Sequence, residues 1–133
     1  MSNQFRKPTP IHAGRGLNLI LSNWADDPVP FRGHRYATAE GAYQSWKSGH
    51  YCAGFENLSG ASAKRLGYGQ PVDKANNVEL MRRILETRFA ISKPFRDALA
   101  NAGILSHPVN DRFWREVYPQ LLTELRNTHS INP

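Results

Sequence analysis

One segment constrains the fold more than any other: residues 73–89, DKANNVELMRRILETRF, repeat their apolar side chains at helical spacing. The apolar positions of this stripe are Val78, Met81, Ile84, Leu85 and Phe89. The stripe covers about one-third of a helix circumference, as expected for a helix that packs one face on a core. The sequence therefore predicts a central amphipathic helix.

Short strands are predicted ahead of this helix. Residues 17–23 alternate apolar side chains, which is typical of a strand. Residues 29–38 are predicted to form a hairpin with Arg32 and Gly33 in its turn. Residues 1–16 contain two prolines and two glycines and are predicted to be an irregular arm.

Capping residues predict the other helices. Thr38 can cap a helix that ends near Gly49. Pro94 suits the first turn of a second predicted helix, over 93–103. The remaining predicted helices cover 59–69 and, beginning at Pro119, 119–128. The expected fold is α+β and mainly α, with a small sheet or hairpin, in one domain over 17–133.

Composition narrows the possible partners and location. The net charge is +6, and this positive field favours polyanions such as nucleic acid or a small diphosphate. Cys52 is the single cysteine, so no internal disulfide is possible and a cytoplasmic location is expected, either in the producing cell or in an infected host cell. No secretory leader, membrane span, metal-ligand spacing or glycine-rich phosphate loop is recognised, so we expect no metal and no cofactor.

Two acidic segments could carry chemistry. Glu40 and Gln44 lie one helical turn apart, and Asp111 precedes Trp114 in NDRFWRE. Two carboxylates on separate segments suit cleavage at an anomeric carbon, where an anion stabilises the oxocarbenium-like cation. The helix N-terminus is expected to keep Glu40 ionised. Helix stabilisation by Glu40 and capping by Asp111 are structural alternatives that these residues alone leave open.

The order of several motifs resembles the NADAR family, which includes the YbiA-type N-glycosidases. Its opening signature is matched by Ser22, Asn23, Trp24, Tyr36, Thr38, Glu40, Tyr43, Gln44 and Lys47. SAKRLG, VELMRRILETRFA, NDRFW and LLTELR follow in the family's order, so the resemblance runs from about residue 17 to 127.

The resemblance implies a YbiA-like helical fold and a hydrolase that cleaves the N-glycosidic bond of an ADP-ribosyl or phosphoribosyl substrate. Removal of ADP-ribose from modified guanine, in DNA, RNA or a nucleoside, is the expected reaction. Glu40 matches the catalytic glutamate and Asp111 a second functional acid. The residues expected to contact substrate are Asn23, Trp24, Gln44, Lys47, Arg112 and Trp114.

The chain also departs from the family pattern. A glycine-rich stretch and a Gly-Lys-Asn motif are missing after Trp114, and Gly41 stands where relatives have His. Arg112 or Arg115 could replace phosphate contacts of the missing loop, with Lys47 the first choice for the phosphates. The alternatives are a non-catalytic module that binds ADP-ribose or a nucleotide, and a plain nucleic-acid-binding domain. The oligomeric state is left open.

Overall fold

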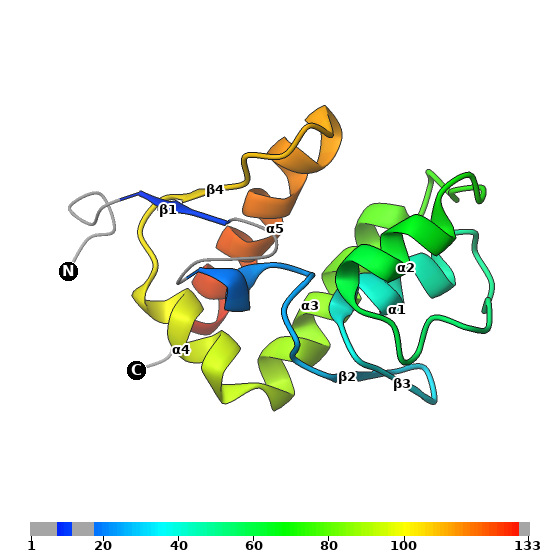
Figure 1. Ribbon diagram of the computed structural model, residues 1–133. Helices are drawn as coiled ribbons and strands as arrows, with labels where there is room; N and C mark the ends of the chain where they lie inside the picture. The colour runs from blue at the N-terminus through cyan, green and yellow to red at the C-terminus, as the bar shows by residue number, and fades with distance from the viewer. Residues whose placement is uncertain (1–7, 12–17, 131–133) are drawn as a thin grey trace.

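The computed structural model describes residues 8–11 and 18–130 (Figure 1). The helices are η2 (Leu19–Leu21, 3-10), α1 (Ala39–Trp46), α2 (Gly60–Gly67), α3 (Asn77–Ile91), α4 (Lys93–Asn101) and α5 (Arg112–Ser130). The strands are β1 (Thr9–Pro10), β2 (Val29–Phe31), β3 (His34–Tyr36) and β4 (Leu105–Ser106). The described part of the chain is therefore mainly helical, as expected.

Helix α3 is the central element. It packs on α1, β2, α4 and α5, and in Figure 1 it runs between α1 and α2 on one side and α4 and α5 on the other. Met81, Ile84 and Leu85 are buried, whereas Val78 and Phe89 are half-buried at the edges of the stripe. The predicted helix is confirmed, although it begins at Asn77 rather than at 73 and reaches Ile91.

The predicted hairpin is confirmed. Strands β2 and β3 pair antiparallel, with Val29 opposite Tyr36. Arg32 (φ 49°) and Gly33 (φ 84°) are both left-handed, which is the pattern of a two-residue turn that matches strand twist. The Arg32 guanidinium lies 4.7 Å from the ring centre of Trp46, a contact that offsets the cost of its backbone conformation.

The predicted strand at 17–23 is wrong, because Leu19–Leu21 forms the 3-10 helix η2. The Arg88 side chain of α3 donates to the carbonyls of Ile20 (2.5 Å) and Ser22 (3.1 Å). These acceptors are therefore used by a side chain and are not available to a neighbouring strand. Periodicity alone does not separate a short apolar strand from a helical turn.

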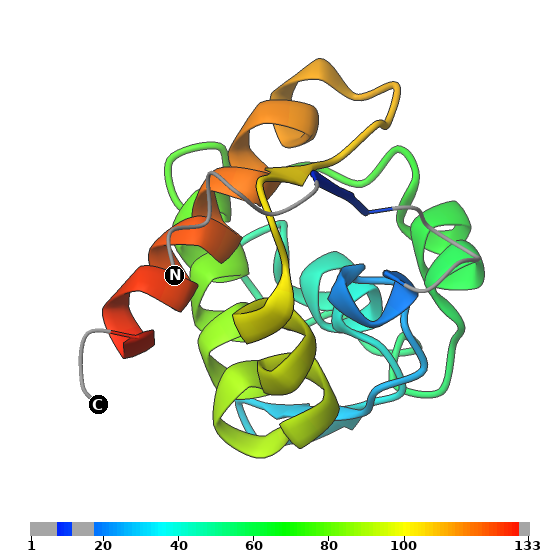
Figure 2. The same cartoon turned by 90° about the vertical axis from the view of Figure 1, so that its left-hand side faces the viewer.

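Part of the predicted irregular arm is a strand. Thr9 and Pro10 pair in parallel with β4, and Ile11 is completely buried (Figures 1 and 2). The ladder uses the backbone N–H groups of Thr9 and Ile11, so the missing N–H of Pro10 costs nothing. The expectation of irregular structure is wrong for Thr9 and Pro10, and the core extends N-terminal to the expected domain start. The rest of the arm, at 1–7 and 12–16, lies outside the described residues.

Helix α5 begins earlier than predicted. It starts at Arg112, so Pro119 lies inside the helix and not near its start. A proline inside a helix costs about 3 kcal/mol, because a backbone hydrogen bond is lost. Burial of Tyr118, Leu121 and Leu122 on the inner face offsets this cost.

Within 8–11 and 18–130, no helix combines the length and apolarity needed to cross a bilayer. The cytoplasmic location stays a prediction.

Arg88 makes a buried polar contact with several partners. Its side chain is 1% exposed, pairs with Asp27 at 3.0 Å and lies 4.1 Å from the ring centre of Phe95. Together with the carbonyls of Ile20 and Ser22, these partners satisfy a guanidinium removed from water. The contact ties the segment after η2 to α3.

We expect Arg88→Met to lower the free energy of unfolding by about 3–5 kcal/mol, because it leaves the Asp27 carboxylate and two carbonyls without their donor. Urea denaturation followed by circular dichroism measures the change. Arg83→Met is the matched control, since the Arg83 side chain is 62% exposed on the same helix. Equal losses in the two variants would contradict the prediction.

Candidate active site

The start of α1 positions Glu40. Thr38 caps the helix, because its hydroxyl accepts from the N–H of Gly41 at 3.1 Å. The N–H of Glu40 donates to the carbonyl of Asn23 at 3.0 Å, which joins the helix to the segment after η2. A Cβ at Gly41 would lie 2.9 Å from the Phe55 carbonyl oxygen, so this backbone leaves no room for a larger residue.

Gln44 holds the Glu40 carboxylate. Its Nε2 donates to Oε2 of Glu40 at 2.7 Å. Its Oε1 is buried, has no hydrogen-bond partner among the described residues, and lies 2.0 Å from where a Cβ of Gly67 would stand. Glycine at 67 therefore lets α2 approach α1 closely enough to confine this amide.

Burial controls the charge of Glu40. Removal from water raises the pKa of its carboxyl, while the hydrogen bond from Gln44 and the charges of Lys64 and Lys47 act in the opposite direction. From the sequence, the helix N-terminus is expected to keep Glu40 ionised. Desolvation acts against this effect and is the largest influence on the pKa of Glu40, and its ionisation stays a prediction.

Lys47 and Asn23 are buried beside this helix. The ammonium of Lys47 donates to the carbonyl of Gly67 at 2.8 Å, and burial lowers the pKa of Lys47. The amide of Asn23 donates to the sulfur of Met81 at 3.1 Å. Both side chains thus brace the elements around Glu40, and their contacts to substrate stay predictions.

Trp24 packs on the first residue of α2. A Cβ at Gly60 would lie 2.5 Å from Cγ of Trp24, so the indole rests directly on the helix backbone. The ammonium of Lys64 lies 6.0 Å from the Trp24 ring centre. Lys64 was not among the predicted site residues, although positions 60, 64 and 67 share one face of α2.

The second acidic segment lies at the start of α5. Oδ1 of Asp111 accepts from the N–H of Trp114 at 3.2 Å, which confirms the capping interpretation. The Trp114 ring meets Tyr43 edge-on, with centroids 5.4 Å apart. Burial raises the pKa of Tyr43, and the charges of Glu40 and Asp111 add to this rise. Both acids are thus close enough to act on one side chain between them.

Arg112 and Trp46 contribute differently from the other candidates. Arg112 is exposed on the first turn of α5, and its phosphate contact stays a prediction. Trp46 donates to the Tyr36 hydroxyl at 3.0 Å and packs edge-on against Phe31. Trp46 therefore belongs to the packing of the hairpin.

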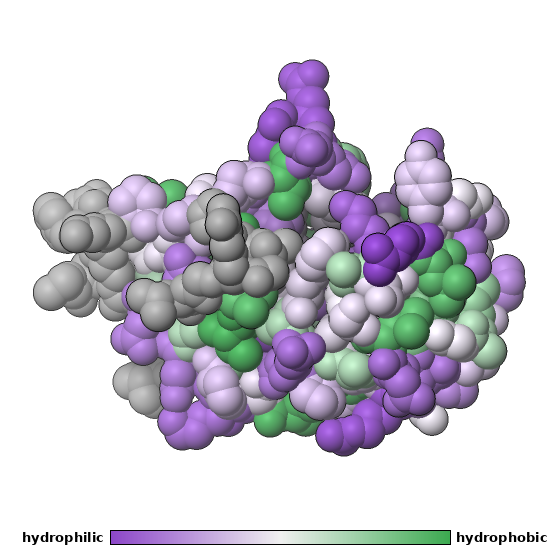
Figure 3. All heavy atoms as spheres, in the orientation of Figure 1, coloured by the Kyte–Doolittle hydropathy of each residue, from purple (hydrophilic) through white to green (hydrophobic). Residues whose placement is uncertain are grey.

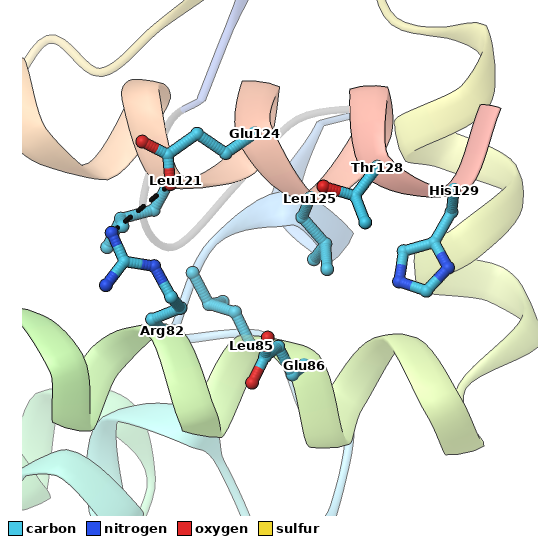
Figure 4. A pocket seen from close by; sticks show the side chains of 8 residues that line it. All are labelled: Arg82, Leu85, Glu86, Leu121, Glu124, Leu125, Thr128 and His129. Atoms are coloured by element: carbon cyan, nitrogen blue, oxygen red, sulfur yellow. Dashed lines mark hydrogen bonds and ion pairs between the residues drawn. The ribbon is translucent and has the colours of Figure 1, made fainter. Parts of the chain in front are cut away.

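The space-filling view shows a hollow between two projections of the surface, which correspond in Figure 1 to the start of α5 and the end of α2 (Figure 3). A different groove lies between α3 and α5 (Figure 4). Its lining residues are Arg82, Leu85, Glu86, Leu121, Glu124, Leu125, Thr128 and His129. None of the predicted site residues lines that groove, so it is not the candidate site.

No metal cluster is found in the part of the chain that the structure describes, where three or more His, Cys, Asp or Glu residues never gather closely enough to hold an ion.

The fold is similar to that of a solved protein. Comparison with known structures matches the NMR structure of the E. coli protein YbiA with a TM-score of 0.78 and 22% sequence identity, over 92% of this chain and 84% of YbiA. No protein-family model and no curated protein matched the chain. The protein therefore has a YbiA-like fold, as expected from the order of its motifs.

The raised pKa of Glu40 has a consequence for stability. The folded state holds this proton more tightly than the unfolded chain, so ionised Glu40 reduces stability as the pH rises above the unfolded value of about 4.3. We expect Glu40→Gln to melt a few degrees higher than wild type at pH 8. The difference should shrink towards zero near pH 4, where Glu40 is protonated in both states.

Thermal unfolding between pH 4 and pH 8 measures this dependence. Glu116→Gln removes an exposed carboxylate of α5 and is the matched control. A Glu40→Gln variant that is less stable than wild type at pH 8, or equally shifted at every pH, would contradict the prediction.

Proposed function

We propose that this protein is an N-glycosidase of the NADAR family, which hydrolyses the bond between a base and the ribose of an ADP-ribosyl or phosphoribosyl group. In its most specific form, the proposed reaction removes ADP-ribose from modified guanine in nucleic acid or a nucleoside. The observation that carries this proposal is the Glu40 carboxylate. It is half-buried, held by Gln44, and close to the charges of Lys47 and Lys64.

The proposed reaction consumes one water. The C1′–N bond breaks, its electron pair goes to the base, and the base takes up a proton. Glu40 stabilises the cation that develops at C1′. A water oxygen then bonds to C1′ while its proton passes to Glu40, which later returns it to solvent.

The electrostatics of Glu40 suit this role. A base is most effective when its pKa lies near the working pH, and burial moves the pKa of Glu40 in that direction. The positive charges of Lys64 and Lys47 limit the rise, so the carboxylate form remains accessible. The same burial strengthens its attraction to a cationic sugar.

Aromatic rings come from the segments on which Glu40 and Asp111 lie or pack. Trp24 comes from the segment after η2, and Tyr43 and Trp114 form an edge-on pair between α1 and α5. We assign these rings to stacking on the base and to excluding water. Asp111, while capping α5, is assigned to orienting the ribose hydroxyls or assisting proton transfer.

We expect Glu40→Gln to keep the fold and to reduce turnover of ADP-ribosylated guanosine by about 10²–10³-fold, because the amide has no negative charge to offer the transition state. Chromatography of the released ribosyl product measures this, with Glu116→Gln as the control. Undiminished turnover in the Glu40 variant would refute the assignment.

The same assay separates the other candidate functions. A wild-type protein that binds ADP-ribose in calorimetry, yet releases product from none of a panel of ADP-ribosylated bases and phosphoribosyl compounds, would be the non-catalytic module instead. Binding to nucleic acid that falls steeply with salt and ignores ADP-ribose would indicate a plain nucleic-acid-binding domain.

A further inference from the structure

Lys64 differs from Lys47 and Arg88, the two buried basic side chains near the candidate site. Lys47 is engaged with the carbonyl of Gly67, and Arg88 is paired with Asp27. Lys64 is exposed on α2 and forms no ion pair with a carboxylate in the part of the chain that the structure describes. Its charge is therefore available to an external anion.

Trp24 forms a rigid floor near this charge. The indole lies against the backbone of Gly60, and the Lys64 ammonium stands 6.0 Å from its ring centre. An aromatic face beside an ammonium excludes water from one side and strengthens any ion contact made there.

His107, which follows β4, can report on the charge near Lys64. Its Nδ1 lies 3.3 Å from the carbonyl oxygen of Ile11, so this nitrogen carries the proton and donates it. Its ring lies 4.9 Å from that of Tyr118. Burial lowers the pKa of His107, and the charge of Lys64 lowers it further. Lys64 thus lies close enough to influence both His107 and Glu40.

We propose that Lys64 and Trp24 form an anion subsite that binds the phosphate group or groups carried on the 5′ carbon of the ribose. The two residues come from α2 and from the segment after η2, and both act on the Glu40 carboxylate that is assigned to C1′. The position of the ribose relative to this subsite rests on the proposed function, whereas binding of the anion can be tested without it.

This assignment differs from the one that the sequence favoured. Lys47 was the first choice for the phosphates, but its ammonium already serves a backbone carbonyl in the interior. Lys64 needs to break no such bond in order to meet a phosphate oxygen. Charge-assisted contacts of this kind contribute about 1.5–3 kcal/mol, so losing one corresponds to about 10–100-fold in affinity.

Calorimetry with inorganic pyrophosphate, ribose 5-phosphate and ADP-ribose tests the subsite. We expect Lys64→Gln to weaken binding about 10–100-fold. Arg65→Gln, at the next exposed position of the same helix, removes the same charge and should change it less than about twofold. Loss for ribose 5-phosphate alone identifies a monophosphate ester as the ligand, and loss for pyrophosphate and ADP-ribose identifies a diphosphate. An equal loss of affinity in the two variants, or no loss of affinity for any probe, would overturn the subsite.

NMR titration provides a readout at His107. Pyrophosphate bound in the subsite should raise the pKa of the His107 imidazole, because the anion favours its protonated form, whereas exposed His50 should not respond. An unchanged pKa of His107 in saturating pyrophosphate would contradict binding of the anion beside Lys64.

The two proposals fail differently. Binding that depends on Lys64, without cleavage of any glycoside, would sink the proposed function and leave the subsite intact. Cleavage by Lys64→Gln with the wild-type KM would sink the subsite and leave the function intact.

Discussion

The buried guanidinium of Arg88 is the contact on which the candidate site depends. It fastens the segment after η2 to α3 by serving two carbonyls and the carboxylate of Asp27. That segment in turn provides the carbonyl of Asn23 to the start of α1 and places Trp24 on α2. A chain with strands of only two or three residues leaves many backbone carbonyls outside regular ladders, and buried carbonyls need donors. Arg126 does the same for the end of α4, where it donates to the carbonyls of Ala102 and Gly103.

Two glycines of α2 bring the site together. The indole of Trp24 packs on Gly60, and the amide of Gln44 packs on Gly67. One face of α2 therefore contacts both the Trp24 ring and the side chain that holds the Glu40 carboxylate. This packing fixes the position of the Glu40 carboxylate but reduces its contact with water. Glu40 is held in place but desolvated, and this combination of order and raised pKa is common at catalytic carboxyls. A stability cost at Glu40 is therefore consistent with a role in chemistry rather than in helix capping.

Part of the candidate site could be predicted from spacing along the chain. Glu40 and Gln44 are one helical turn apart, and their hydrogen bond follows from that register. Asp111 caps the residue three positions later, again a local relation. The sequence did not indicate a role for Lys64, because its charge comes near Glu40 only when α2 packs on α1 in the folded chain. The raised pKa of Glu40 was also beyond reach, since desolvation depends on neighbours from distant segments.

The fold divides along the same line. The sequence alone determined the hairpin turn, the cap at Thr38 and the central helix, because each follows from a few adjacent residues or from one helical period. Tertiary structure decided the helical turn at Leu19–Leu21, the parallel pairing of Thr9–Pro10 with Leu105–Ser106, and the extension of α5 through Pro119. In each of these cases local preference was weak, and the free energy came from burial and from hydrogen bonds to residues far along the chain. Arg88 is the clearest example. From the sequence, a charged residue of this helix is expected to be exposed, and its burial is explained only by the carbonyls of Ile20 and Ser22 and by the carboxylate of Asp27.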